Sequence, residues 1–222
     1  FSYGGSLTNN GLVYGSLPVV AANLSLQTAI ANQVNLLVQN SPGEVQFWNG
    51  GKTTPDGSIG GGSGVWGPST NWTDSNGTQA LGSNGQFAVF GGASGTVTVV
   101  GQQSFSGIQF LTNNYQLVAG SGGALAPINA ADGSLAAVRV NDGLTTTISA
   151  PLVGTGGIEK TDLGTLVLNG ANSFSGGVNL KGGSISLGNE KGLGSGMLAM
   201  DDGTKITLTA NGMTIANNLH MT

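Results

Sequence analysis

Short apolar segments that recur about every 20 residues constrain the fold of this chain more than any other feature. Three apolar triplets and one upstream isoleucine share this spacing: 166–168, 185–187, 206–208 and Ile148. An Asn-Gly or Gly-Asn dipeptide follows each triplet. Such a period is typical of solenoids, in which one turn cannot bury its apolar face alone and therefore stacks on its neighbours.

A second echo supports the same architecture. Ser-Phe-Ser-Gly at 104–107 returns at 173–176, and an apolar-polar-apolar segment follows each copy, at 108–110 and 178–180. This offset corresponds to roughly three or four turns of the shorter period. Alternating segments bury one face, and glycine adopts the positive φ that tight turns require. The sequence therefore predicts an all-β fold, a parallel β-solenoid of roughly ten rungs that runs through residues 1–222 as a single unit.

Composition excludes several other classes. The 222 residues include 41 glycines without a Gly-X-Y period, which excludes collagen, and 38% hydrophobic residues, which argues against disorder. The net charge is −4, and the basic residues are scattered singly, so no stripe exists for nucleic-acid phosphates. These basic residues are Lys52, Arg139, Lys160, Lys181, Lys191 and Lys205. The absence of cysteine fits passage through an oxidising periplasm. The sequence starts at Phe1 in mid-pattern, with neither a signal peptide nor a membrane-length apolar run, as expected of a piece of a longer chain.

One segment, residues 23–38, is compatible with two secondary structures. Leu26, Ile30, Val34 and Leu37 fall at helical spacing. The same segment also alternates, at Leu24 and Leu26 and again from Val34 to Val38, and no C-cap signal follows before the proline at 42. Strand is the favoured interpretation.

A longer motif carries a family resemblance. The sequence Gly-Thr-Gly-Gly-Ile-Glu-Lys at 154–160 is followed at 163–177 by Leu-Gly-Thr-Leu-Val-Leu-Asn-Gly-Ala-Asn-Ser-Phe-Ser-Gly-Gly. Together with the Leu-Gly-Asn and Gly-rich tail that follows, residues 154–200 resemble the passenger-associated transport repeat of autotransporters. One departure lies at 161–163, where Thr-Asp-Leu replaces a segment that often contains glycine; this difference is expected to lengthen or reshape one corner.

The resemblance implies a right-handed parallel β-helix in a secreted passenger. It also implies translocation through a C-terminal outer-membrane β-barrel that is absent from this chain, followed by display at the bacterial cell surface or release from it. Residues 44–80, rich in Trp and Gly, resemble a segment that often precedes such repeats and are expected to form an irregular segment or side loop. Four aromatic residues there form either a local core or an exposed recognition patch for a protein or glycan: Phe47, Trp48, Trp66 and Trp72.

Chemical motifs are weak throughout. Gly51-Lys52-Thr53 lacks the first glycine of a P-loop, and the only histidine, His220, lies two residues from the end. Acidic residues precede glycine at 132, 142 and 201–202, a pattern that favours turns over calcium sites. The sequence therefore predicts no catalytic, cofactor or metal site, and a protein that is not an enzyme.

The functional expectation is a structural and adhesive rod. It would attach to a host-cell surface or extracellular-matrix protein or glycan, or would self-associate, because a long solenoid face suits many weak contacts. Two alternatives remain open: a secreted effector or toxin that acts on a host receptor, and a repeat that mainly assists secretion and folding of the passenger.

Overall fold

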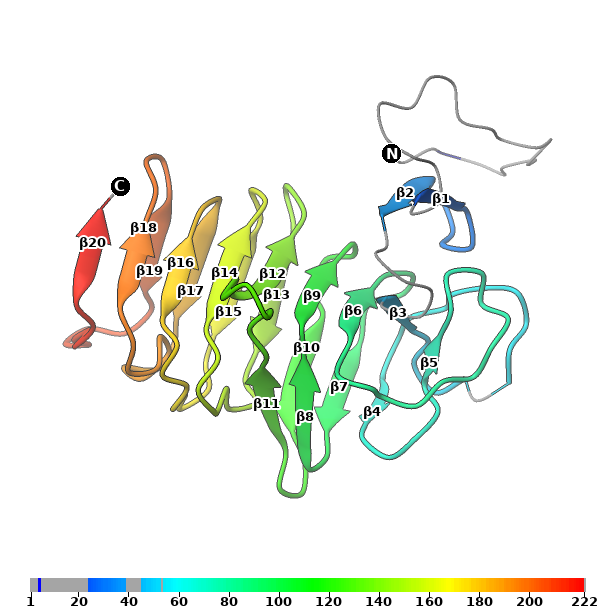
Figure 1. Ribbon diagram of the computed structural model, residues 1–222, viewed down its shortest axis with the longest axis horizontal. Helices are drawn as coiled ribbons and strands as arrows, with labels where there is room; N and C mark the ends of the chain where they lie inside the picture. The colour runs from blue at the N-terminus through cyan, green and yellow to red at the C-terminus, as the bar shows by residue number, and fades with distance from the viewer. Residues whose placement is uncertain (1–3, 5–23, 39–44, 53, 222) are drawn as a thin grey trace.

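The computed structural model describes residues 4, 24–38, 45–52 and 54–221. Within these ranges the chain forms strands, turns and loops without any helix. Accordingly, no helix in this part of the chain is long and apolar enough to cross a membrane. Strands from successive turns lie side by side along the long axis of the molecule, as Figure 1 shows.

The largest sheet has nine strands, of which eight are parallel. The ninth, β5, pairs antiparallel with β3 and forms one edge. In spatial order the strands are β20 (Leu219–Met221), β18 (Leu198–Met200), β16 (Val178–Leu180), β14 (Ile158–Thr161), β12 (Ala136–Val140), β9 (Gly107–Phe110), β6 (Phe87–Phe90), β3 (Val45–Trp48) and β5 (Trp72–Thr73).

A second, seven-stranded parallel sheet forms another wall of the solenoid, and a pair of parallel strands, β8 (Gln102–Phe105) and β11 (Ala124–Pro127), adds a short third wall. The seven strands are β19 (Lys205–Leu208), β17 (Ser184–Leu187), β15 (Thr165–Leu168), β13 (Thr145–Ile148), β10 (Gln116–Ala119), β7 (Thr96–Val99) and β4 (Gly64–Trp66). Apart from these walls, β1 (Leu24–Gln27) and β2 (Asn35–Val38) form an antiparallel hairpin, so the strand interpretation of this segment is confirmed.

The spacing seen in the sequence is the register of the solenoid. In the seven-stranded sheet, Ile148 lies opposite Leu168, and Leu168 lies opposite Leu187. Leu187 lies opposite Leu208 on the next turn. In the nine-stranded sheet, Ile158 pairs with Val178 and Val178 with Leu198, steps of 20 residues. Alternating residues of each strand point inward, which gives a continuous apolar core between the sheets.

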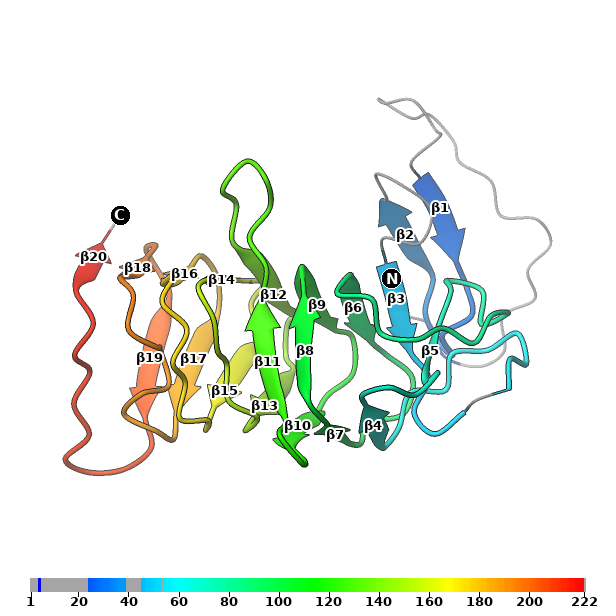
Figure 2. The ribbon, with the colours of Figure 1, turned by 60° about the horizontal axis from the view of Figure 1, so that its bottom comes forward.

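The number of turns is lower than expected. From β6 to β20 the chain makes about six turns, not roughly ten rungs. Two features account for the difference. First, residues 24–38 form the hairpin and much of 49–86 forms loops, so neither stretch adds regular turns. Second, the step from Gly107 to Ala137 takes 30 residues, because residues 128–135 protrude beside the solenoid (Figure 2).

The long echo is confirmed as an offset of three turns, with a shift in register. Ile108 lies opposite Val138, Val138 opposite Lys160, and Lys160 opposite Leu180. Ile108 therefore stacks in the column of Leu180, two residues beyond its counterpart in the sequence alignment. The inward direction is preserved because a shift of two residues keeps the same face.

Asn172 shows how the corners between strands are held. Its side chain is 3% exposed. The Oδ1 atom accepts a hydrogen bond from the backbone N–H of Leu152 at 2.8 Å, and Nδ2 donates to the carbonyl of Gly192 at 2.6 Å. One amide thus connects three successive turns and satisfies backbone groups that no strand partner reaches.

Asn172→Ala should lower the free energy of unfolding by about 1–3 kcal/mol, because it leaves a buried N–H and a buried carbonyl without partners. Chemical denaturation followed by circular dichroism measures the change. The matched control is Asn169→Ala in the same corner, whose side chain is exposed and should matter little. Equal losses for the two variants would show that the bridge contributes nothing specific.

Candidate functional site

The Trp-rich segment is a packed aromatic cluster. Trp48, Trp66 and Trp72 are each no more than 2% exposed. Trp72 meets Trp48 and Trp66 edge to face, with ring centroids 5.1 and 5.0 Å apart, and the three indoles surround Phe90. Such pairs stabilise beyond the area that they bury. The cluster fills the end of the solenoid core next to β3 and β5.

Two of the indole N–H groups have partners inside the molecule. Trp48 Nε1 donates to the carbonyl of Gly62 at 2.7 Å, and Trp66 Nε1 donates to Ser83 Oγ at 2.9 Å. These bonds fix the loops at Gly62 and Ser83 onto the core. The burial contradicts an exposed recognition patch and agrees with the other interpretation, a local core.

Phe47, the fourth residue of the expected patch, lies in a separate small cluster. It is 2% exposed and packs with Ile30, Ile59 and Val89. Ile30 comes from the turn of the β1–β2 hairpin, so the hairpin covers the outer face of the nine-stranded sheet at this end. Phe47 is therefore also unavailable to a partner.

Tyr115 ties the loops near this end together. Its hydroxyl lies 2.8 Å from the carbonyl oxygen of Gly91 and 2.6 Å from that of Ala93, and it accepts a hydrogen bond from Gly62 N–H at 3.1 Å. Burial raises the pKa of the phenol to about 12. Gly61 has φ +64 and no room for a Cβ beside the Tyr115 hydroxyl, so this close approach requires glycine.

The lysine of the transport-repeat motif is fully buried. Lys160 lies in an inward-facing column, and its Nζ donates to the carbonyl oxygens of Thr161 and Asp162 at 2.8 Å and of Gly182 at 3.1 Å. Burial lowers the pKa of Lys160 to about 8, although the Asp162 carboxylate acts to raise it. The motif lysine therefore serves an internal corner and not the surface.

The corner at 161–163, after Lys160, is formed without glycine. Asp162 itself adopts φ +61, a conformation that favours glycine. Its carboxylate accepts hydrogen bonds from Arg139 at 3.1 and 3.3 Å, on the preceding turn. Strand β15 follows in register, so the altered corner leaves the sheet intact.

The buried lysine predicts a specific pH dependence. Unfolding restores the pKa from about 8 to 10.5, so between these values the unfolded chain binds more protons than the folded one. The free energy of unfolding should therefore rise with pH through this window. Urea unfolding at pH 7, 8.5 and 10 measures this rise. Lys160→Met is the comparison variant, because it lacks the lysine but keeps the titration of Tyr115. A difference between wild type and variant that does not change with pH would contradict the prediction.

No catalytic constellation is present in the part of the chain that the structure describes. No three His, Cys, Asp or Glu side chains come together there as metal ligands, and His220 is exposed on β20. Lys52 of the P-loop-like sequence pairs with Asp56 at 2.7 Å on an exposed loop. Asp132 accepts a hydrogen bond from Ser134 N–H at 2.9 Å, which is an ordinary Asx turn.

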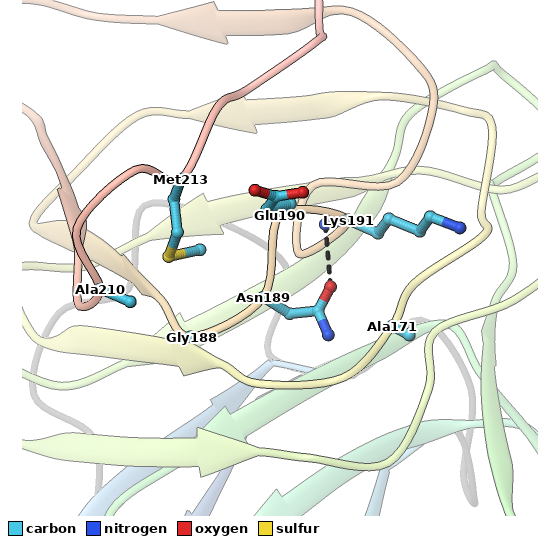
Figure 3. A pocket seen from close by; sticks show the side chains of 7 residues that line it. All are labelled: Ala171, Gly188, Asn189, Glu190, Lys191, Ala210 and Met213. Atoms are coloured by element: carbon cyan, nitrogen blue, oxygen red, sulfur yellow. Dashed lines mark hydrogen bonds between the residues drawn. The ribbon is translucent and has the colours of Figure 1, made fainter.

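An open groove of about 460 Å³ lies where three successive turns leave the seven-stranded sheet (Figure 3). Its lining combines small or apolar residues from the three turns, called the floor here, with polar residues of the middle turn, called the rim. The floor residues are Ala171, Gly188, Ala210 and Met213, and the rim residues are Asn189, Glu190 and Lys191. A Cβ at Gly188 would collide with the Asn169 side chain, so close stacking of the corners keeps this floor shallow.

Sequence reasoning missed this groove. The Asn-Gly and Gly-Asn dipeptides predict turns, but a single turn does not reveal what the stacked corners leave between them. The available signal was an Ala or Gly within three residues after each triplet, at 171, 188 and 210, since small residues at neighbouring corners leave room for a depression.

Comparison with known proteins agrees with the architecture. The family model of the passenger-associated transport repeat matches residues 158–187, within the expected 154–200. A chain segment with 40% identity over 95% of this chain occurs in the adhesin BmaC autotransporter of Brucella suis biovar 1 (strain 1330). This chain spans 6% of that relative's length. No solved structure matches the chain. These matches identify the chain as an autotransporter passenger sequence, which is secreted or displayed at the outer membrane.

Proposed function

We propose that this chain is an adhesive segment of its passenger and attaches to a protein or glycan of a host-cell surface or extracellular matrix. The observation that carries this proposal is the 40% identity, over nearly the whole chain, to a protein named as an adhesin. Because the chain spans 6% of that relative, the contribution of this particular segment to adhesion is the point at issue.

The shape and surface of the solenoid support an adhesive role. The outer face of the seven-stranded sheet presents Thr, Ser and Val side chains in register, as in the column of Thr145, Thr165 and Ser184. Thr165 and Ser184 share a hydrogen bond of 2.8 Å between their hydroxyls. Such a surface presents many similar weak contact points along one axis.

The direct test uses the purified 222-residue chain. We expect saturable binding to host cells or to immobilised matrix proteins, with the denatured chain as the control for non-specific attachment. Sedimentation velocity of the same sample separates self-association from host binding. A folded chain that stays monomeric and binds neither cells nor matrix proteins would refute the adhesive role.

A second role, assistance to secretion, is favoured by the transport-repeat match at 158–187. Here the stacking is most regular, with steps of 20 residues from Ile158 to Val178 and on to Leu198. Turns that add in register give each newly exported segment a template on which to fold, and this would draw the chain outward.

Deleting residues 158–177 from the natural precursor tests the second role. This deletion removes one whole turn of the repeat and places Val178 where Ile158 stood, so that stacking is preserved. We expect a severalfold loss of surface display at normal synthesis, measured by surface immunolabelling. The control is the deletion of 198–218, also one whole turn but outside the family match. Equal display of the two deletion variants would argue against a special role of the repeat.

A further inference from the structure

The groove formed by Ala171, Gly188, Ala210 and Met213 has two charged side chains on its rim that no other group satisfies. Neither the Glu190 carboxylate nor the Lys191 ammonium takes part in an ion pair or hydrogen bond within the described residues. By contrast, the charges of Lys52, Arg139 and Lys181 are each paired with an acidic residue. Opposite charges at adjacent positions are therefore left without ion pairs beside a groove that three turns form.

Both charged side chains leave one tight turn of the backbone. Asn189 Oδ1 accepts a hydrogen bond from the backbone N–H of Lys191 at 2.9 Å and closes an Asx turn. Figure 3 shows the Lys191 side chain directed away from Met213, with Glu190 between the two. The two side chains form no ion pair with each other, so each is available to a ligand of opposite charge.

The rim also offers a neutral hydrogen-bond donor. Since Asn189 uses its Oδ1 atom in the turn, its Nδ2 group is left for an external acceptor. The floor beneath contributes methyl groups of two alanines and the half-buried thioether of Met213, which packs against the main core. Methionine adapts its shape to apolar partners at little cost.

We propose that this groove binds an extended peptide segment of a partner protein, with a basic side chain facing Glu190, an acidic one facing Lys191, and a small apolar side chain on the floor. A peptide also supplies a backbone carbonyl for Asn189. The groove has no aromatic lining residue on which a sugar ring could stack, so its chemistry favours a peptide over a glycan. This proposal assigns the adhesive contact to a specific site, and it rests on the proposed adhesive function.

The test follows the methyl group of Met213 by NMR in the intact 222-residue chain labelled at its methionines, of which there are four. The probe is a capped peptide, Gly-Ala-Lys-Ala-Asp-Ala-Gly. Three matched peptides carry Lys, Asp or Ser at both charged positions. We expect the mixed-charge peptide to shift the Met213 signal in a saturable manner. The three matched peptides should bind more weakly, by about fivefold or more.

Two variants locate the interaction. Lys191→Glu reverses one rim charge, and Ala171→Leu fills the floor from an exposed position that leaves the core untouched. Each should reduce binding about fivefold or more. Lys205→Glu is the matched control, because it makes the same charge change on an exposed residue of β19 away from the groove, and its binding should equal that of the wild type.

Several results would overturn the proposal. These are equal binding of the mixed-charge and matched peptides, full retention of binding by Lys191→Glu, no shift of Met213, or a shift produced only by a neutral oligosaccharide. Measuring cell adhesion of the same variants distinguishes failure of the groove proposal from failure of the proposed adhesive function. If wild type and Lys191→Glu adhere equally, the groove is not the adhesive contact although the segment is adhesive. If the wild type does not adhere, the adhesive function itself fails.

Discussion

Each turn of this solenoid depends on its neighbours for both its hydrogen bonds and its core. A strand of three to five residues has backbone N–H and C=O groups on both edges and one apolar face, and none of these is satisfied within its own turn. In-register stacking satisfies all of them together, as the columns through Leu168 and through Val178 show. The corners follow the same logic, since the Asn172 amide and the Lys160 ammonium bond to backbone groups of their own and adjoining turns.

The two ends of this stack are built differently. Toward the N-terminal end, β5 runs antiparallel to β3, the indoles of Trp48, Trp66 and Trp72 fill the core, and the hairpin covers the sheet through Ile30. An antiparallel edge strand interrupts the parallel template that another turn would need. At the opposite side of the sheet, β20 continues the parallel stacking on β18. The Trp-rich segment therefore closes one end of the solenoid, and this explains why its aromatic residues are unavailable for recognition.

The sequence predicted the regular part of the molecule well because stacking leaves a direct trace in spacing. The triplets near Leu166, Ile185 and Ile206 form strands, and the residues that align between the triplets are the residues that pair between the strands. The number of turns was wrong because the count assumed one period throughout, whereas residues 128–135 protrude and residues 24–38 form a hairpin. The burial of Trp48 and Trp66 was left open because composition does not reveal which loops fold back over an end. The groove was missed since it belongs to no single turn and arises only where three turns meet.

Stacking in steps of 20 residues also gives the rod a mechanical character. Strands lie across the long axis (Figure 1), so tension along that axis separates neighbouring turns one after another and does not load all strand pairs at once. Each turn that peels away releases 20 residues, or roughly 70 Å of extended chain. An attachment at one point of such a rod would yield under shear by lengthening in discrete increments. The part of the solenoid behind the break would keep its core.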